Sequence, residues 1–127
     1  MRRVVIDSDI AIDFLRGREY ALKLLKKLWR SDAAFLSATT LFELYAGMRE
    51  SEKEDTENFI QACNVLPVTS QISMVAGELY RAQRKHGKTL DAIDCINHAA
   101  AIVHDCQFAT RNVSHYPGCD RLLEIET

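Results

Sequence analysis

The stretch Val4-Val5-Ile6-Asp7-Ser8-Asp9-Ile10 decides the fold class of this chain. Its first three residues are β-branched and do not alternate with polar ones, which predicts that residues 3–6 form a short strand buried on both faces in a parallel sheet. Asp7 and Ser8 follow at once and can cap a helix, which the sequence predicts to run through Leu15 and to stop near Gly17. A buried strand that passes directly into a helix indicates an α/β protein.

The remainder of the chain continues this alternation of helices and strands. The helical period of apolar residues predicts helices over residues 19–30, 40–48, 56–63, 70–86 and 90–103. Short apolar runs predict further strands at residues 34–36, 65–68, 107–109 and 122–125. Pro67 restricts the second of these strands to a sheet edge. We therefore expect a three-layer α/β sandwich, in which helices flank a mostly parallel central sheet of about four to five strands.

Length and composition are those of one ordinary globular domain. A chain of 127 residues buries roughly two-thirds of its unfolded surface, so we expect a single domain over residues 1–127. The net charge of −2 lacks the basic excess that is usual in nucleic-acid-binding proteins, so any phosphate-binding surface must be local. The apolar run before Asp7 is too short for a signal peptide or a membrane span, which predicts a cytoplasmic protein without membrane contact.

The four cysteines form no C-x-x-C pair, so neither a zinc site nor a dithiol redox motif is indicated. We expect free thiols, buried or half-buried, in a reducing compartment. These residues are Cys63, Cys95, Cys106 and Cys119.

Three acidic residues, Asp7, Glu43 and Asp94, occur where a parallel sheet would bring them together. Asp7 follows the first strand, and Glu43 lies early in the helix after the second strand. In open α/β sheets, functional sites form outside the carboxyl ends of the strands. Carboxylates that converge on one point repel each other unless a cation lies between them. The sequence therefore predicts a divalent metal site built from these acids.

Some of these acids also have a purely structural interpretation. Asp7 can be a helix N-cap, and Asp9 in the same turn is a weaker candidate for the site. Glu43 closes the sequence Thr40-Leu41-Phe42-Glu43, which is a capping box for the helix that it begins. On that box alone, Glu43 would be assigned to helix capping.

The predicted helix over residues 90–103 carries a polar stripe of Asp91, Asp94 and His98. An exposed helix face explains such a stripe, and it is the interpretation that we prefer for His98. Asp94 differs, because its apolar neighbours place it near the core boundary, where an unpaired carboxylate is costly. Asp91 remains an alternative third acid.

The order and spacing of four segments carry a resemblance to a known family. The segments are Val5-Ile6-Asp7-Ser8-Asp9-Ile10, Asp13-Phe14-Leu15-Arg16-Gly17, Ser37-Ala38-Thr39-Thr40-Leu41-Phe42-Glu43-Leu44, and Asp94 placed sixteen residues ahead of Thr110-Arg111-Asn112. Together they resemble PIN-domain ribonucleases, specifically VapC-type toxins, over nearly the whole chain. The sequence departs from the family pattern at Asn97 and His98, where relatives often have Ile and Ala.

The resemblance implies a PIN-like fold and a Mg²⁺- or Mn²⁺-dependent endoribonuclease, held inactive by a small antitoxin encoded beside it, and it suggests a homodimer. It implies that Asp7, Glu43 and Asp94 form the acidic catalytic set. It also implies that Ser8 helps near the substrate, and that Asn112 takes a place where many relatives have a further polar or acidic group.

For the mechanism we expect Asp7 and Asp94 to hold the metal, while Glu43 positions or deprotonates the water that attacks an RNA phosphodiester. Asn112 is the weakest catalytic candidate, because its side chain is neutral. Arg111 would contact substrate phosphates. Further basic residues that we expect to help it are Lys88, Arg84 and Lys85.

Two other functions remain open. Asp7-Ser8-Asp9 after a strand mimics the nucleophile motif of haloacid-dehalogenase-like phosphatases, although Ala11 occupies a position where that motif has Thr or Val. A non-catalytic interaction module is the other alternative. Its acids would be helix caps and solvated faces, and it predicts no dependence on metal.

Overall fold

A four-stranded sheet in the order β3-β2-β1-β4 forms the centre of the computed structural model, which describes residues 2–126. The strands are β1 (Val4–Ile6), β2 (Ala34–Ser37), β3 (Asn64–Leu66) and β4 (Gln107–Ala109). All neighbouring strands are parallel, and Val5 pairs with Phe35 on one side and with Phe108 on the other. The expected parallel sheet is therefore confirmed, and β3 lies at its edge and ends before Pro67.

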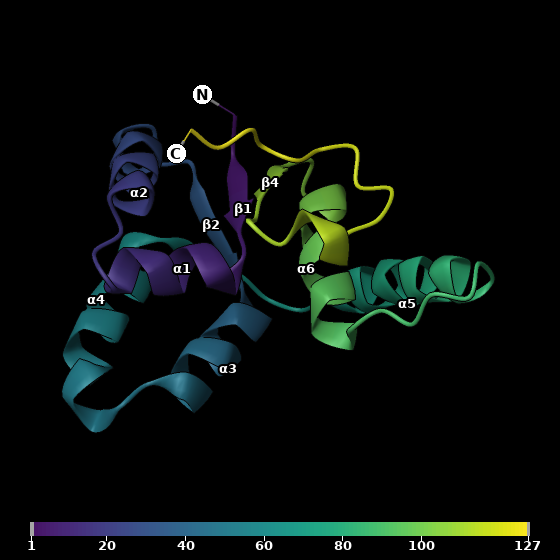
Figure 1. Cartoon of the computed structure of the whole chain (residues 1–127), viewed down its shortest axis with the longest axis horizontal. Coiled ribbons are helices and arrows are strands. Elements are labelled where there is room, and N and C mark those ends of the chain that lie inside the picture. The colour runs from purple at the N-terminus through teal and green to yellow at the C-terminus, as the bar shows by residue number, and fades with distance from the viewer. Residues whose placement is uncertain (1, 127) are drawn as a thin grey trace.

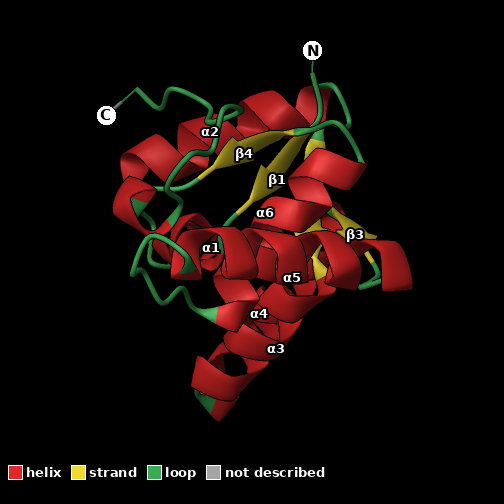
Figure 2. Ribbon diagram, turned by 90° about the vertical axis from the view of Figure 1, so that its right-hand side faces the viewer, coloured by secondary structure: helices red, strands yellow, loops and turns green. Residues whose placement is uncertain are grey.

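Helices cover both faces of this sheet (Figure 1, Figure 2). They are α1 (Ser8–Leu15), α2 (Glu19–Arg30), α3 (Ala38–Gly47), α4 (Lys53–Ala62), α5 (Ser70–Arg84) and α6 (Ala92–Val103). Successive side chains of a strand point to opposite faces. Val4 and Ile6 accordingly pack into one buried cluster with residues of α1, α2 and α4, whereas Val5 packs into a second cluster with residues of α5 and α6. The three expected layers are present.

The predicted strand over residues 122–125 is wrong. Leu122 makes only an isolated parallel bridge with Phe108. Two backbone hydrogen bonds of 2.8 Å support it, from Phe108 N to Arg121 O and from Leu123 N to Phe108 O. Beyond the bridge, Leu123 and Ile125 pack against the cluster under α1 and α2. Apolar contacts therefore fix this segment to the core without a further strand ladder.

The cysteines behave as the sequence predicts. All four are free thiols, and Cys95 and Cys106 are buried in the core. A separate observation concerns the helices: none of those in the described part of the chain has both the length and the apolar composition that a membrane crossing requires.

Candidate active site

Asp7 lies at the carboxyl end of β1, where the chain passes from the buried strand into α1. Its side chain is 4% exposed and accepts a hydrogen bond of 2.8 Å from the backbone N–H of Ser8, as the N-cap of α1. The capping role predicted for Asp7 is therefore confirmed. It does not exclude a second role, because a carboxylate has two oxygens and about four acceptor positions.

Three side chains from other elements also donate to Asp7. Its Oδ2 accepts from the hydroxyl of Thr110 at 2.8 Å and from the hydroxyl of Tyr116 at 2.8 Å. Its Oδ1 accepts from the side-chain amide of Asn97 at 3.4 Å. These donors come from the segment after β4 and from α6, so the tertiary fold itself sets the orientation of the carboxylate.

Asp94 reaches the same point from the first turn of α6. Its Oδ1 lies 3.1 Å from the Tyr116 hydroxyl, and its Oδ2 lies 3.3 Å from Nδ1 of His115. Burial raises the pKa of Asp94, the hydrogen bond from Tyr116 lowers it, and the negative charge of Asp7 raises it again. The structure thus brings Asp7 and Asp94 to one shared hydroxyl group.

Asp91 is the N-cap of α6. Its Oδ1 accepts hydrogen bonds from the backbone N–H groups of Ile93 at 2.9 Å and Asp94 at 3.2 Å. Because helix capping already engages this exposed side chain, the geometry favours Asp94 as the acid that faces Asp7.

Glu43 lies on α3, and the capping-box interpretation of this residue is wrong. The helix begins at Ala38 with Ser37 as its N-cap, so Thr40 is already inside the helix and is fully buried. Several residues in this segment can cap a helix, and the burial of Thr40 decides between them. Glu43 is consequently not held by a cap interaction.

One oxygen of the Glu43 carboxyl group lacks a hydrogen-bond partner in the described part of the chain. Its Oε1 is buried and has no hydrogen-bond partner among the described residues. Burial raises the pKa of Glu43, the nearby Ser8 hydroxyl lowers it, and the charges of Asp7 and Asp94 raise it. A buried acceptor without a partner is costly, so this oxygen is suited to a water, a cation or a substrate group.

The donor set fits a hard divalent cation that keeps most of its own waters. Residues 2–126 contain no group of three or more His, Cys, Asp or Glu side chains close enough to enclose a metal ion. Mg²⁺ commonly takes only one or two carboxylates, and substrate phosphate and water supply the other oxygens. Asp7 and Asp94 match that pattern, and neither forms an ion pair with Lys or Arg in the described structure.

The remaining sequence candidates lie at the edge of this site. Asp9 accepts from the backbone N–H of Arg111 at 2.8 Å, which ties the segment after β4 to α1. The Arg111 guanidinium lies 4.6 Å from the ring centre of Tyr20. Asn112 is exposed, and its backbone N–H donates to the Thr110 hydroxyl at 3.0 Å. Asp9 is therefore engaged in the fold, whereas Arg111 and Asn112 face solvent beside the carboxylates.

The structure contradicts two other predictions from the sequence. His98 is 6% exposed and packs edge-on against Tyr116, so the prediction of an exposed helix face for this residue is wrong. Burial lowers the pKa of His98, and the charge of Arg121 lowers it further.

Arg84 and Lys85 lie at the outer end of α5, on the far side of α6 from α1 (Figure 1). The structure does not bring them to Arg111.

Sequence reasoning missed Asn97, His115 and Tyr116 as members of the site. Asn97 had a signal, because it is an amide within an apolar helix and departs from the family pattern. His115 and Tyr116 had none, because they lie at the end of the 3-10 helix Val113–His115, which is too short for a period of apolar residues to reveal.

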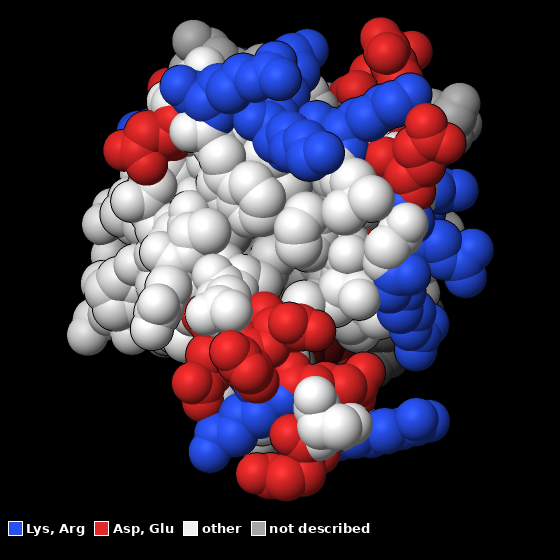
Figure 3. Space-filling model, turned by 90° about the vertical axis from the view of Figure 1, so that its left-hand side faces the viewer, with Lys and Arg blue, Asp and Glu red and all other residues white. Residues whose placement is uncertain are grey.

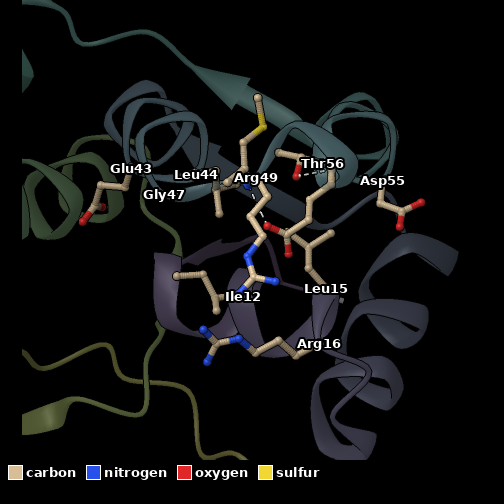
Figure 4. Close-up of a pocket in the computed structure, with 11 residues that line it drawn as sticks. Ile12, Leu15, Arg16, Glu43, Leu44, Gly47, Arg49, Asp55 and Thr56 are labelled. Carbon is tan, nitrogen blue, oxygen red and sulfur yellow. Dashed lines mark hydrogen bonds between the residues drawn. The ribbon is translucent and has the colours of Figure 1, made fainter.

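A cavity of about 420 Å³ opens beside Glu43, between α1, α3 and the beginning of α4. Figure 4 shows Glu43 at one side of this cavity and Arg49 reaching across it toward Ile12 and Arg16 on α1. Figure 3 shows Asp and Glu side chains gathered over α4 and its preceding turn, and Lys and Arg over α2. The cavity therefore joins the site to a mixed, largely acidic surface.

Comparisons with known proteins agree with this geometry. The family model of the PIN domain matches residues 4–116. Ribonuclease VapC19 of Mycobacterium tuberculosis is 38% identical over 114 residues, which cover 89% of this chain and 91% of that protein. Ribonuclease VapC10 of the same organism is 31% identical over 119 residues, which cover 94% and 90%.

A solved structure shows the same fold at lower sequence identity. The toxin–antitoxin complex from Klebsiella pneumoniae contains a chain with a TM-score of 0.80 and 21% identity to this one, over 95% of this chain and 96% of that chain. The matched residues include the strands β1 to β4 and the acids Asp7, Glu43 and Asp94. The chain belongs to the PIN-domain family.

Proposed function

We propose that this protein is a Mg²⁺- or Mn²⁺-dependent endoribonuclease, a VapC-like toxin that cleaves RNA phosphodiesters and is neutralised by a cognate antitoxin. One observation carries the proposal: the Asp7 and Asp94 carboxylates meet at one hydroxyl group, and Glu43 beside them keeps a buried oxygen without a partner. The relatives that bear the name ribonuclease support the same activity.

Each acid has a distinct role in this mechanism. Asp7 and Asp94 would hold the cation, which would supply positive charge to the scissile phosphate and its leaving oxygen. Glu43 accepts the proton of the attacking water, a role that suits a carboxyl group whose pKa burial has raised. Arg111 contacts a substrate phosphate, and Ser8 and Asn112 add a hydroxyl and an amide at the edge of the site.

The decisive test uses Asp94→Asn, because Asp94 makes fewer fold-stabilising contacts than Asp7. We expect RNA cleavage to be lost and Mn²⁺ binding in calorimetry to weaken strongly, while the circular dichroism spectrum is retained. Asp91→Asn is the matched control on the same helix, and it should keep cleavage. RNA cut by the Asp94→Asn protein at the wild-type rate would refute the assignment.

Two further measurements separate the nuclease from the two alternative functions. A non-catalytic interaction module predicts no thermal shift when Mn²⁺ is added to the wild-type protein. A phosphatase of the haloacid-dehalogenase type predicts a trapped aspartyl-phosphate on Asp7. Both oxygens of Asp9 accept backbone hydrogen bonds, from Ile10 and from Arg111, which leaves this side chain poorly placed for acid–base work.

The cavity beside Glu43 is where we expect an antitoxin segment to bind. A chain lying there would reach Glu43. Its basic and acidic side chains could pair with the charged residues that line the same cavity, which are Glu52, Asp55, Arg16 and Arg49. Gly47 lines the cavity, and a Cβ atom added there would meet no atom within 4 Å. Gly47→Trp should therefore fold, keep cleavage and resist neutralisation by the antitoxin encoded beside it. Full neutralisation of this variant would place the antitoxin elsewhere.

We also expect a homodimer that acts in the cytoplasm, where its free thiols stay reduced. Phe42, Tyr45 and Met74 are large apolar side chains exposed by 65%, 43% and 67%, and they provide surface for self-association. Light scattering measures the mass in solution, and a monomer of 14.4 kDa at micromolar concentration would contradict the expectation.

A further inference from the structure

The Tyr116 hydroxyl makes contacts that no role described so far explains. It lies 2.8 Å from Asp7 Oδ2 and 3.1 Å from Asp94 Oδ1, and so touches both carboxylates of the proposed metal site. A phenol carries one hydrogen, so it can make one full hydrogen bond and must share it between the two oxygens. The hydroxyl is therefore a single donor held between two acceptors.

The position of this hydroxyl is fixed by packing and not by the carboxylates. Tyr116 is 3% exposed. Its ring centre lies 4.7 Å from that of Phe108 on β4, in an edge-to-face arrangement, and 6.2 Å from that of His98 on α6. Both partners are buried core residues. Because the ring packs between the sheet and α6, it cannot rotate away, so its hydroxyl oxygen is held in a fixed position.

We propose that Tyr116 is a positioning residue, whose clamped hydroxyl sets the separation and orientation of the Asp7 and Asp94 carboxylates for a divalent cation. This inference rests on the proposed function and adds a chain-specific part to it. The hydroxyl engages only one oxygen of each carboxylate. Oδ2 of Asp94 does not contact Tyr116; it lies 3.3 Å from Nδ1 of His115, an exposed imidazole that a cation would displace.

The physical reason is the repulsion between two carboxylates held close together. Thr110 and Asn97 also hold Asp7. Without a cation or the Tyr116 hydroxyl, Asp94 would therefore turn away from Asp7, and binding a cation would require it to be ordered again. A donor placed between them offsets part of the repulsion and keeps the pair assembled. Groups that orient metal ligands typically contribute about 10–100-fold to metal affinity or activity.

Tyr116→Phe tests the inference, because it removes the oxygen and keeps the ring that packs on Phe108. In calorimetry with MnCl₂ alone, we expect the full chain to bind Mn²⁺ about tenfold more weakly. Cleavage should be lost at limiting Mn²⁺, and raising the Mn²⁺ concentration should restore most of it. Tyr80→Phe is the matched control, because Tyr80 packs against the same cluster without contacting a carboxylate.

A merely structural role predicts a different pattern. Wild-type Mn²⁺ affinity in Tyr116→Phe would overturn the inference, as would a loss of cleavage that Mn²⁺ cannot restore. Failure of the proposed function is recognised separately, because the wild-type protein itself would then neither bind Mn²⁺ nor cleave RNA.

A metal-free measurement gives a second, independent test. With EDTA present, the unfolding free energies of Tyr116→Phe, Asp94→Asn and the double variant form a cycle. We expect the effects to be non-additive, because each substitution removes the same contact. Additive effects would overturn the positioning role.

Discussion

The side-chain amide of Asn97 donates to Oδ1 of Asp7 at 3.4 Å, across 90 positions of sequence. The side-chain oxygen of Asn97 in turn accepts from the Thr39 hydroxyl at 2.7 Å. Asn97 is fully buried, so no water replaces these partners. One amide thus joins the beginning of α3 to the end of β1, and it holds a proposed metal ligand through the oxygen that the Tyr116 hydroxyl does not contact.

Asn97→Ala should destabilise the protein by about 1–3 kcal/mol, because it leaves the half-buried Thr39 hydroxyl without its acceptor and removes a donor from the buried Asp7. Urea unfolding followed by circular dichroism measures the change. Asn58→Ala removes the same chemical group from an exposed position on α4. That control should lie within about 0.5 kcal/mol of wild type, and equal losses in the two variants would contradict the prediction.

Glu43→Gln should stabilise the metal-free protein at neutral pH. Burial raises the pKa of Glu43 above the ordinary value of a glutamate side chain, so the folded protein binds more protons than the unfolded chain between the two pKa values. The free energy of unfolding therefore decreases as the pH rises through this interval, and the penalty persists at pH 7. A neutral side chain removes it.

Melting curves recorded with EDTA at pH 7 measure this effect, and the variant should melt at a higher temperature than wild type. The order should reverse when Mn²⁺ is added, because only the wild-type protein has the full acidic set. A variant that melts below wild type in EDTA would mean that the Glu43 charge is stabilised by the fold.

The elements found from sequence are those that local patterns determine. The apolar run of β1 and the capping position of Asp7 follow from residues adjacent in the chain, so pattern and structure agree. The beginning of α3 does not follow from residues adjacent in the chain. Several residues there can cap a helix, and the burial of Thr40 excludes it as the N-cap. The strand predicted over residues 122–125 is wrong for a related reason: the apolar residues of this segment pack against the core without forming a strand.

The same distinction between local pattern and tertiary contact applies to the candidate site. Spacing and family resemblance identify Asp94, whereas the contact of Tyr116 with both carboxylates exists only when α6 and the segment after β4 pack together. No one-dimensional pattern encodes a hydroxyl placed between residues 87 positions apart, which is the sequence distance from Asp7 to Asp94. Such a contact requires the tertiary structure.

Mn²⁺ affinity should fall as the pH is lowered. Burial first, and the charge of Asp7 as well, raise the pKa of Asp94 above the ordinary value of an aspartate side chain, and burial raises that of Glu43. Protons therefore compete with the cation at a higher pH than for free carboxyl groups. Below the raised pKa, affinity should fall about tenfold per pH unit for each displaced proton. Calorimetry at pH 7 and pH 5 tests this, and an affinity that rises on acidification would contradict it.

Arg111→Ala should weaken RNA binding by removing one phosphate contact. The Arg111 guanidinium lies over the Tyr20 ring, and its backbone is tied to Asp9, so the charge is held beside the carboxylates. In an Asp94→Asn background, which prevents cutting, fluorescence anisotropy over a range of salt concentrations gives the slope of log affinity against log salt. Each lost phosphate contact reduces the magnitude of that slope by about 0.7 for single strands.

Lys85→Ala is the control for this measurement, because it removes a positive charge at the C-cap of α5, the end of that helix that lies away from α6 (Figure 1). Its slope should equal that of the parent protein if RNA follows the α1 side of the molecule. A reduced slope in Lys85→Ala together with an unchanged slope in Arg111→Ala would instead direct the RNA across α5 and α6. The two variants thus decide on which side of Asp94 the substrate backbone runs.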